Sequence, residues 1–297
     1  MIKVLVIVGP TAIGKTSLSI SLAKQFNGEI ISGDSIQIYK GLDIGSGKVL
    51  ESEMDNIKHY GIDILNPNDN FSVYEFQTKA REYINNINDN GKLAIICGGT
   101  GLYIKALLYD YIFVDQKELD YSIYDDLSNQ QIYNQLLDKD PKSLDKIHIN
   151  NRQRLVRALA MADNNIIKSE QIDSQEHKLI YDAMIIGLTD DREEVYNRIN
   201  MRVDNMFNIG LEKEVRDLID KGITFDNQCM QAIGYKEFKA YFDNEITLEE
   251  TKELIKRNSR RYAKKQYTWF NNQTPIKWFK NKEYDVLVDE VKQWIKN

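Results

Sequence analysis

A segment near the N-terminus has the residue types of a phosphate-binding loop. It reads GPTAIGKT and lies between an apolar run and a stretch with helical spacing, which is the context that the pattern G-x-x-x-x-G-K-[ST] requires. Its glycines allow backbone N–H groups to face phosphate oxygens, and the following helix adds its positive dipole end. Lys15 can reach an outer phosphate and Thr16 can bind Mg²⁺. The candidate phosphate-binding residues are Gly9, Pro10, Thr11, Ala12, Ile13, Gly14, Lys15 and Thr16.

This loop predicts that a di- or triphosphate binds, although a chance match in a glycine-containing turn is the alternative. In many nucleotide hydrolases, another apolar strand delivers a Mg²⁺-binding Asp. Here the best candidate strand, Leu93–Cys97, leads into GGTGLY instead. Transfer chemistry on a bound phosphate compound is therefore favoured over the use of ATP as a fuel.

A carboxylate follows the second apolar run. That run surrounds Ile30, and Asp34 comes just after it, in the segment GDSIQIYKGLDIGSGK. Open α/β sheets bind ligands at the carboxyl ends of their strands, so Asp34 and the phosphate loop should share one edge. Asp34 could act there as a general base. Capping of the next helix or an indirect contact to Mg²⁺ explains its position equally well, and Asp43 is a weaker second candidate.

Short apolar runs alternate with helical patterns through the first half of the chain. The expected strands are Val4–Val8, a run around Ile30, Gly61–Leu65, Leu93–Cys97 and, later, Ala183–Leu188. The clearest helical face carries Phe76, Ala80, Tyr83, Ile84 and Ile87, and it follows a capping-box pattern at Ser72 and Glu75. We therefore predict an α/β fold in which helices flank a parallel sheet that carries the phosphate loop.

Three regions are expected along the chain. Residues 1–112 form the α/β core, and residues 113–177 form a mainly helical insertion that contains the segment Asn151–Ala162. Residues 178–297 complete the core with a late strand and C-terminal helices, one of which starts with a capping box at Thr247 and Glu250.

Composition limits the class of protein. The 297 residues include 39 Lys and Arg and 45 Asp and Glu, which gives a net charge of −6 and disfavours binding of nucleic acid through bulk charge. No apolar run approaches the roughly 18 residues of a membrane span. Two cysteines and three histidines provide neither a disulfide framework nor zinc-ligand spacing. We expect a cytoplasmic monomer that has no membrane partner.

The ordered motifs resemble those of the tRNA dimethylallyltransferases, also called tRNA isopentenyltransferases. The similarity extends from Met1 to about Phe270. The motifs that carry it are GPTAIGKT, DSIQIYKGLDIGSGK, FSVYEF, GGTGLY, RQRLVRAL and IGYKE. The resemblance implies transfer of a dimethylallyl group from dimethylallyl diphosphate to N6 of the adenosine on the 3′ side of the tRNA anticodon, at position 37. Mg²⁺ and the tRNA anticodon stem-loop are the implied cofactor and partner, and whether ATP also binds the loop stays open.

The resemblance also implies roles for individual residues. Asp34 resembles the general base, Lys15 and Thr16 the contacts to diphosphate and Mg²⁺, and either Arg198 or Arg202 an arginine on the diphosphate. The implied tRNA contacts are Asp34, Ser35, Ile36, Gln37, Thr100, Gln153, Arg154, Leu155, Val156, Arg157, Gly234 and Tyr235. A carboxylate base suits this reaction because the adenine N6 lone pair is delocalised into the ring.

A basic segment offers one place for RNA. Lys256–Phe270 has six basic residues and no acidic one, and on a helix Arg257, Arg261, Lys264 and Lys265 share one side. An ordinary solvated helix face is the alternative. Two other functions compete with the leading hypothesis: a small-molecule kinase, in which Asp34 would activate a hydroxyl, and a non-catalytic RNA- or nucleotide-binding switch.

Overall fold

The chain forms two compact units. The computed structural model describes residues 1–111, 113, 119–167, 178–273 and 275–297. The larger unit comprises Met1–Tyr109 and Leu179–Asn297, and the smaller unit comprises Asp110–Lys178. The sequence had suggested an insertion at 113–177, so its expected limits lie within three residues of the limits of the smaller unit.

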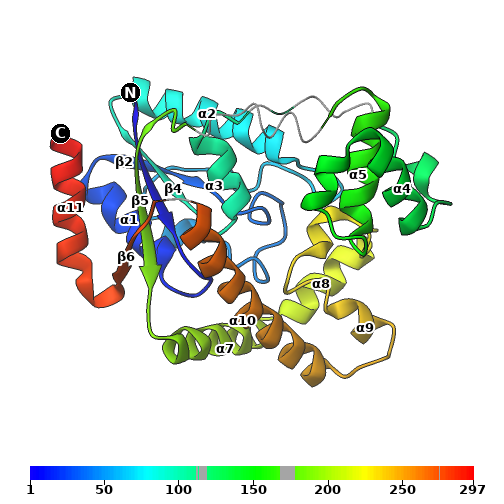
Figure 1. Ribbon diagram of the computed structural model, residues 1–297. Coiled ribbons are helices and arrows are strands. Elements are labelled where there is room, and N and C mark those ends of the chain that lie inside the picture. The colour runs from blue at the N-terminus through cyan, green and yellow to red at the C-terminus, as the bar shows by residue number, and fades with distance from the viewer. Residues whose placement is uncertain (112, 114–118, 168–177, 274) are drawn as a thin grey trace. The chain divides into compact units, whose positions relative to one another are not determined.

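A six-stranded parallel sheet forms the centre of the larger unit (Figure 1). The strand order is β3-β2-β4-β1-β5-β6. Residues Val4–Val8 of the central strand are fully buried, as expected for a strand that is covered on both faces. The strands are β1 (Lys3–Val8), β2 (Gly28–Ser32), β3 (His59–Tyr60), β4 (Leu93–Cys97), β5 (Asp182–Thr189) and β6 (Lys277–Lys280).

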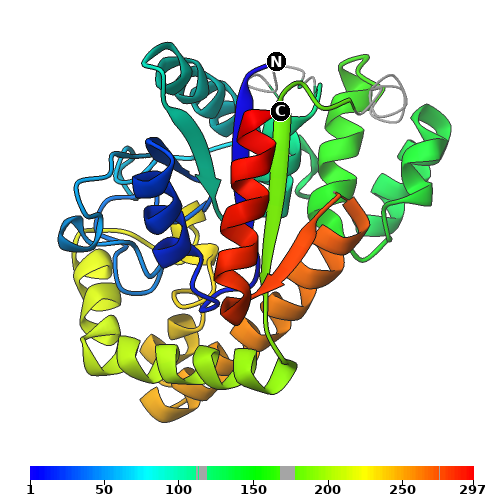
Figure 2. The ribbon, with the colours of Figure 1, turned by 90° about the vertical axis from the view of Figure 1, so that its left-hand side faces the viewer.

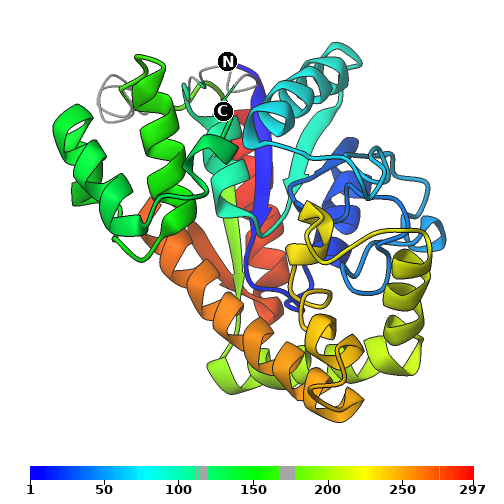
Figure 3. The same ribbon diagram turned by 90° about the vertical axis from the view of Figure 1, so that its right-hand side faces the viewer.

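Helices cover both faces of this sheet. Helices α1 (Lys15–Gln25) and α11 (Tyr284–Lys296) lie on one face (Figure 2), and α2 (Val73–Asp89), α3 (Gly101–Leu108) and α10 (Leu248–Gln273) lie on the other (Figure 3). Helix α7 (Arg192–Asn208) follows β5 and crosses below the carboxyl ends of the strands (Figure 1). Helices α8 (Leu211–Asp220) and α9 (Phe238–Phe242) complete the unit. Among the described helices, none combines the length and the apolar character that a membrane crossing needs.

Two capping boxes begin helices where the sequence predicted them. Ser72 Oγ accepts a hydrogen bond from the backbone N–H of Glu75, and the Glu75 carboxylate accepts one from Ser72 N at 2.8 Å. Thr247 and Glu250 form the same reciprocal pair before α10. Each pair satisfies backbone donors that a helix start would otherwise leave without a partner.

The strand prediction at Gly61–Leu65 is wrong. The strand is the preceding pair His59–Tyr60, and the backbone then turns, with positive φ at Gly61 (76°) and Asp63 (54°). These φ values lie outside the β region, so the segment cannot continue the strand. The apolar residues of GIDIL resemble those of a buried strand, which is why the prediction failed. Strand β6 was not predicted. Only one of its four residues, Phe279, is buried, so it leaves too short an apolar signal.

The smaller unit is helical and has its own core. Its described helices include α4 (Asn129–Lys139) and α5 (Arg152–Asp163). Arg152 donates hydrogen bonds to the backbone carbonyls of Tyr124, Asp125 and Leu127, which ties α5 to the segment before α4. The core contains Tyr124, Ile132, Leu136, Ile147, Leu155, Ala158, Leu159 and Ala160.

Candidate active site

A cavity of about 880 Å³ lies within the larger unit, at the carboxyl ends of its parallel strands. This is the edge at which open α/β sheets bind their ligands. Residues from the phosphate loop, from the segments after β2 and β4, and from α7 and α10 line the cavity. The sequence-predicted residues among them are Thr11, Ala12, Gly14, Lys15, Thr16, Asp34, Ser35, Ile36, Gln37, Thr100, Arg198, Arg202 and Gly234.

The phosphate loop turns sharply between β1 and α1. Gly9 has a φ of 144°, and a Cβ there would lie 2.6 Å from the carbonyl oxygen of Leu188. Gly14 has a φ of 100° and immediately precedes α1. Both positions need glycine, the first for close backbone approach and the second for its left-handed conformation. The loop thereby points the N-terminus of α1 at the cavity, which favours a bound anion.

Lys15 lies along the inside of this loop. Its ammonium group donates hydrogen bonds to the carbonyl oxygens of Gly9 (3.0 Å) and Pro10 (2.7 Å). Withdrawal of the ammonium group from solvent and the nearby charge of Arg202 together lower the pKa of Lys15 to about 8, while Cys97 and Asp34 oppose the shift. A bound phosphate group would stabilise the charged form of this ammonium group.

The Thr16 hydroxyl could bind a metal ion in the cavity. It is exposed on the first turn of α1 and lines the cavity. Within the described ranges, no group of three or more His, Cys, Asp or Glu residues could by itself hold a metal ion. A single threonine hydroxyl fits Mg²⁺, because this ion commonly takes one or two protein oxygens together with substrate phosphates and water.

Asp34 follows β2 by two residues and lines the same cavity. Its Oδ1 accepts a hydrogen bond from the backbone N–H of Ile36 at 2.9 Å, which fixes the carboxylate. Within the described part of the chain, Oδ2 has no hydrogen-bond partner. The backbones of Gly33 and Gly98, at the ends of β2 and β4, lie in direct contact. A Cβ at Gly98 would lie 2.3 Å from the Gly33 carbonyl oxygen, so this contact leaves no room for a side chain.

The two candidate arginines of α7 differ in their partners. Arg198 forms an ion pair of 2.9 Å with Asp190. The Arg202 guanidinium instead donates to the carbonyl oxygen of Ser46 at 3.3 Å, and no described carboxylate pairs with it. Burial lowers the pKa of Arg202, and the charge of Asp34 opposes this shift. The structure thus leaves the charge of Arg202, more than that of Arg198, available to an anion in the cavity.

Helix α10 contributes three polar side chains to the cavity that the sequence did not predict there: Tyr262, Lys265 and Gln266. Tyr262 and Lys265 line the cavity, although the sequence placed both in the basic segment. Gln266 is only 5% exposed and donates from Nε2 to the carbonyl oxygen of Gly99 at 3.0 Å. A Cβ at Gly99 would lie 2.2 Å from that nitrogen, so a larger residue there would displace the Gln266 amide. A glutamine after two lysines gave no sequence signal of such a role.

The remaining predicted RNA contacts lie in two different settings. Tyr235 is fully buried, and its hydroxyl bonds to Glu214 and to the backbone of Ser46. In the smaller unit, Leu155 is also fully buried and Val156 packs against the same core, while Gln153, Arg154 and Arg157 have exposed side chains. The side chains of Tyr235 and Leu155 therefore stabilise the protein interior.

The basic residues of α10 separate into two groups. Lys256 pairs with Asp204 and Glu253, and Arg260 bonds to Asn200. By contrast, Arg257, Arg261, Lys264 and Lys265 are exposed, and none of these four pairs with a carboxylate in the described ranges. The four lie on one side of the helix, and Lys265 at the edge of this group also lines the cavity.

The parallel sheet, the phosphate loop and the cavity at the carboxyl edge define an α/β protein with a P-loop fold. Comparison with known proteins then narrows the class. The sequence matches the family described as IPP transferase over residues 37–273. This match covers most of the chain, and the chain belongs to the IPP transferase family.

Curated relatives support this assignment. The tRNA dimethylallyltransferase of Bacillus cereus is 51% identical over 284 residues, which covers 93% of this chain and 89% of the relative. The tRNA dimethylallyltransferase of Anoxybacillus flavithermus is 50% identical over 280 residues, with 93% and 90% covered.

Solved structures agree with the sequence comparison. The tRNA delta(2)-isopentenylpyrophosphate transferase from Staphylococcus epidermidis has a TM-score of 0.75 and 43% identity, covering 100% of this chain and 99% of that one. A eukaryotic dimethylallyltransferase acting on tRNA has a TM-score of 0.83 and 29% identity, covering 95% of this chain and 75% of that one.

Proposed function

We propose that this protein is a tRNA dimethylallyltransferase. It transfers a dimethylallyl group from dimethylallyl diphosphate to N6 of the adenosine adjacent to the anticodon on its 3′ side, at position 37. The products are N6-(dimethylallyl)adenosine and diphosphate. Membership of the IPP transferase family and the names of the relatives support the reaction class.

One structural observation carries the proposal: the phosphate loop, Asp34 and Arg202 line the same cavity. N6 attacks the allylic carbon while the bond from that carbon to the diphosphate oxygen breaks. The N6 proton passes to the carboxylate of Asp34, whose Oδ2 is the oxygen available to receive it. Asp34 is a suitable base because its other oxygen is held by the backbone.

The leaving diphosphate gathers negative charge, and the cations of the cavity stabilise it. The loop amides, Lys15 and Arg202 would contact its oxygens. Arg202 suits this role better than Arg198 because Asp190 already pairs with Arg198. Thr16 would hold Mg²⁺ beside the diphosphate, where the ion supplies further charge neutralisation.

Apolar side chains from two helices would contain the five-carbon chain. Ile199 and Val203 of α7 and Ile255 of α10 line the cavity, and all three are buried. An apolar wall excludes water from the cation-like carbon that develops as diphosphate leaves.

The RNA would meet exposed groups of both units. The target base must leave its stack to reach the cavity, and an unpaired loop nucleotide does so at low cost. Gln37 and Thr100 line this cavity and would contact the target nucleotide. Gln153, Arg154 and Arg157 of α5 and the outward basic face of α10 would contact the RNA elsewhere. Because one chain supplies all these residues, we propose that the protein acts as a monomer, and a tRNA substrate supports a cytoplasmic location.

A mass assay tests the function. Purified protein is mixed with Mg²⁺, dimethylallyl diphosphate and an unmodified tRNA that has adenosine at position 37. The RNA is then digested, and its fragments are analysed by mass spectrometry. We expect a dimethylallyl-sized mass gain on that adenosine. A parallel reaction contains ATP and small hydroxyl compounds. ATP consumption there, without any gain in the first reaction, would identify a kinase instead.

The variant Asp34→Asn tests the assigned base. Transfer should fall by roughly 10² to 10⁴, the usual contribution of a general base, while the affinity for tRNA stays nearly unchanged. Asp55→Asn is a matched control, because Asp55 also follows β2 but pairs with Lys24 outside the cavity. Transfer at the parent rate by Asp34→Asn would remove Asp34 as the base.

A further inference from the structure

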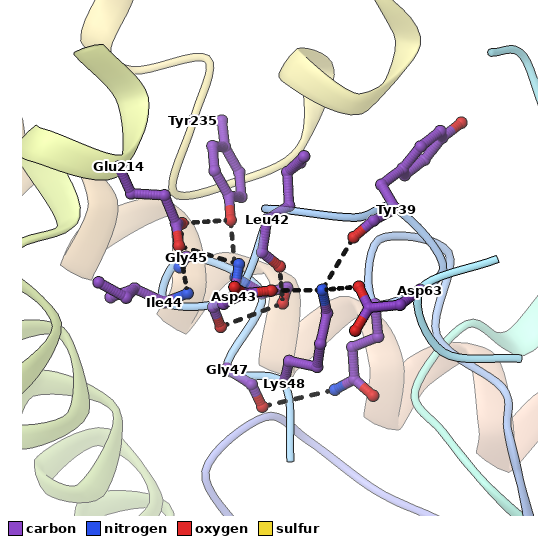
Figure 4. Close-up of polar contacts among 12 residues, drawn as sticks. Tyr39, Leu42, Asp43, Ile44, Gly45, Gly47, Lys48, Asp63, Glu214 and Tyr235 are labelled. Carbon is purple, nitrogen blue, oxygen red and sulfur yellow. Dashed lines mark hydrogen bonds and ion pairs between the residues drawn. The ribbon is translucent and has the colours of Figure 1, made fainter. Parts of the chain in front are cut away.

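Residues 43–47, here called the 43–47 loop, are held by two side chains from the C-terminal half of the chain (Figure 4). The Glu214 carboxylate accepts hydrogen bonds from three consecutive backbone N–H groups: those of Asp43 (2.9 Å), Ile44 (2.7 Å) and Gly45 (3.0 Å). Consecutive N–H groups that converge in this way form an anion-binding concavity. Here the anion is a carboxylate of the protein itself.

Tyr235 completes this hold on the loop. Its hydroxyl donates to Glu214 Oε1 at 2.7 Å and accepts from the backbone N–H of Ser46 at 3.2 Å (Figure 4). Its ring occupies the space beside Gly45, where a Cβ would lie 2.5 Å from the ring. Burial raises the pKa of Tyr235 well above its usual value, and the charge of Glu214 adds to the shift, so the hydroxyl stays a donor.

The other side of the 43–47 loop faces the cavity. The carbonyl oxygen of Ser46 accepts from the Arg202 guanidinium, and that of Gly47 accepts from the Gln37 amide at 3.5 Å. Gly47 has a φ of 58°, and a Cβ there would lie 1.6 Å from an Arg202 nitrogen. The conformation of the loop thus determines where a cavity cation and a cavity amide lie.

The end of the loop is anchored separately. The side chain of Lys48 is only 4% exposed and forms ion pairs with Asp43 and Asp63 (Figure 4). Its ammonium group also donates to the carbonyl oxygen of Tyr39 at 2.8 Å. Within the loop, Gly47 N donates to the carbonyl oxygen of Ile44 and Lys48 N to that of Asp43, both at 3.0 Å. The hydrogen bonds to Glu214 and Tyr235 attach this internally bonded loop to the C-terminal half of the chain.

We propose that Glu214 and Tyr235 are positioning residues, which act through the 43–47 loop to hold Arg202 in the orientation that binds the leaving diphosphate. This inference rests on the proposed function, in which Arg202 contacts that diphosphate. It assigns Tyr235 a role in the reaction that requires no contact between its buried ring and the RNA.

Tyr235→Phe tests the inference because it removes only the hydroxyl. We expect the Kd for Mg²⁺–diphosphate and the KM for dimethylallyl diphosphate to rise by about three- to tenfold, the usual effect of one lost hydrogen bond. The Kd for tRNA should stay within about twofold of the parent value. Tyr241→Phe is the matched control, since the Tyr241 hydroxyl makes no hydrogen bond in the described part of the chain.

Glu214→Gln provides a second variant should Tyr235→Phe fold poorly. A glutamine has one acceptor oxygen and turns an N–H group toward the loop donors, so diphosphate affinity should fall at least as far. Glu212→Gln is its control, because Glu212 lies on the same helix and pairs with Arg216, away from the 43–47 loop. Thermal melting of each variant shows whether it is folded.

A double-mutant cycle with Arg202→Lys separates the possible failures. If Tyr235 acts through Arg202, the two changes should weaken diphosphate binding by less than the product of their separate effects. If Arg202→Lys weakens binding and Tyr235→Phe does not, or only lowers the Tm, the inference is wrong and the proposed function stands. Weaker tRNA binding by Tyr235→Phe would also overturn it. No effect of Arg202→Lys would instead contradict the diphosphate role of Arg202.

Discussion

Lys15 lies in an environment in which its charge, and with it its ability to bind a phosphate, should depend on pH. It is withdrawn from solvent and lies beside Arg202, and these two features lower its pKa to about 8 although two loop carbonyl oxygens accept hydrogen bonds from it. Its positive charge is therefore lost from the free protein at a pH well below the usual value for lysine, 10.5. Since the charged form is the one that attracts the diphosphate, substrate capture should depend on pH in a range where most lysines do not titrate.

A pH profile tests this property of Lys15. Below pH 8 the ammonium group is charged and binds the diphosphate, so kcat/KM for dimethylallyl diphosphate should be high. As pH rises through about 8, the group becomes neutral and kcat/KM should fall, approaching tenfold per pH unit. Lys15→Arg is the control, because an arginine stays charged and should lose this fall even where its rate is lower. A parent profile that is flat to pH 9.5 would contradict the prediction.

For single residues, the sequence predicted which groups line the cavity better than it predicted which side chains contact one another. The phosphate loop and Asp34 follow directly from strand ends, and the structure places them on one cavity. The choice between Arg198 and Arg202 could not be made, because it depends on Asp190, which pairs with only one of them. The roles of Glu214 and Gln266 were also hidden, since each depends on a backbone group more than 160 residues away.

Secondary-structure elements were predictable where a local signal sets their limits. The strands β1, β2, β4 and β5 are continuous apolar runs, and the helices that begin after Ser72 and Thr247 have reciprocal caps. The prediction failed at Gly61–Leu65 because backbone angles, rather than hydrophobicity, end the strand there. It missed β6 because this edge strand pairs only with β5, and tertiary pairing outweighs its weak local pattern.

Helix α10 has both cavity-lining residues and an outward basic face. Replacing Arg261 and Lys264 by Gln removes two exposed charges that have no carboxylate partner in the described ranges. If these side chains contact RNA phosphates, tRNA binding should weaken and the slope of log K against log salt should decrease in magnitude by about 1 to 2.

The control for this double variant is Lys277→Gln with Lys292→Gln. It changes the net charge equally, but Lys277 and Lys292 pair with Glu290 and Asp289. Binding is measured at several salt concentrations for both double variants. A slope that stays at the parent value in the α10 variant would show that this face does not contact the RNA.

On the scale of the whole molecule, all the residues proposed to act on the diphosphate and on N6 belong to the larger unit, and the smaller unit is one insertion with its own core. The chain leaves and re-enters the larger unit at one point. Tyr109 and Leu179 form an antiparallel bridge, and Asp110 N donates to the carbonyl oxygen of Lys178 at 3.0 Å. The hydrophobic cluster around Leu5 and Ile186 contains no residue from the described part of the insertion. Diphosphate binding and part of tRNA recognition should therefore be separable.

Excision of the insertion tests this separation. Residues 111–177 are replaced by Asn-Gly, because two paired strand ends can be joined by a two-residue hairpin turn of that sequence. We expect the shortened protein to fold and to bind Mg²⁺–diphosphate within about threefold of the parent, since every proposed diphosphate contact remains. Its tRNA affinity should fall by about tenfold or more as the α5 contacts are lost. The full-length variant Gln153→Ala/Arg154→Gln should show part of the same loss with diphosphate binding unchanged. A folded, shortened protein that no longer binds diphosphate would show that the insertion contributes to the phosphate site itself.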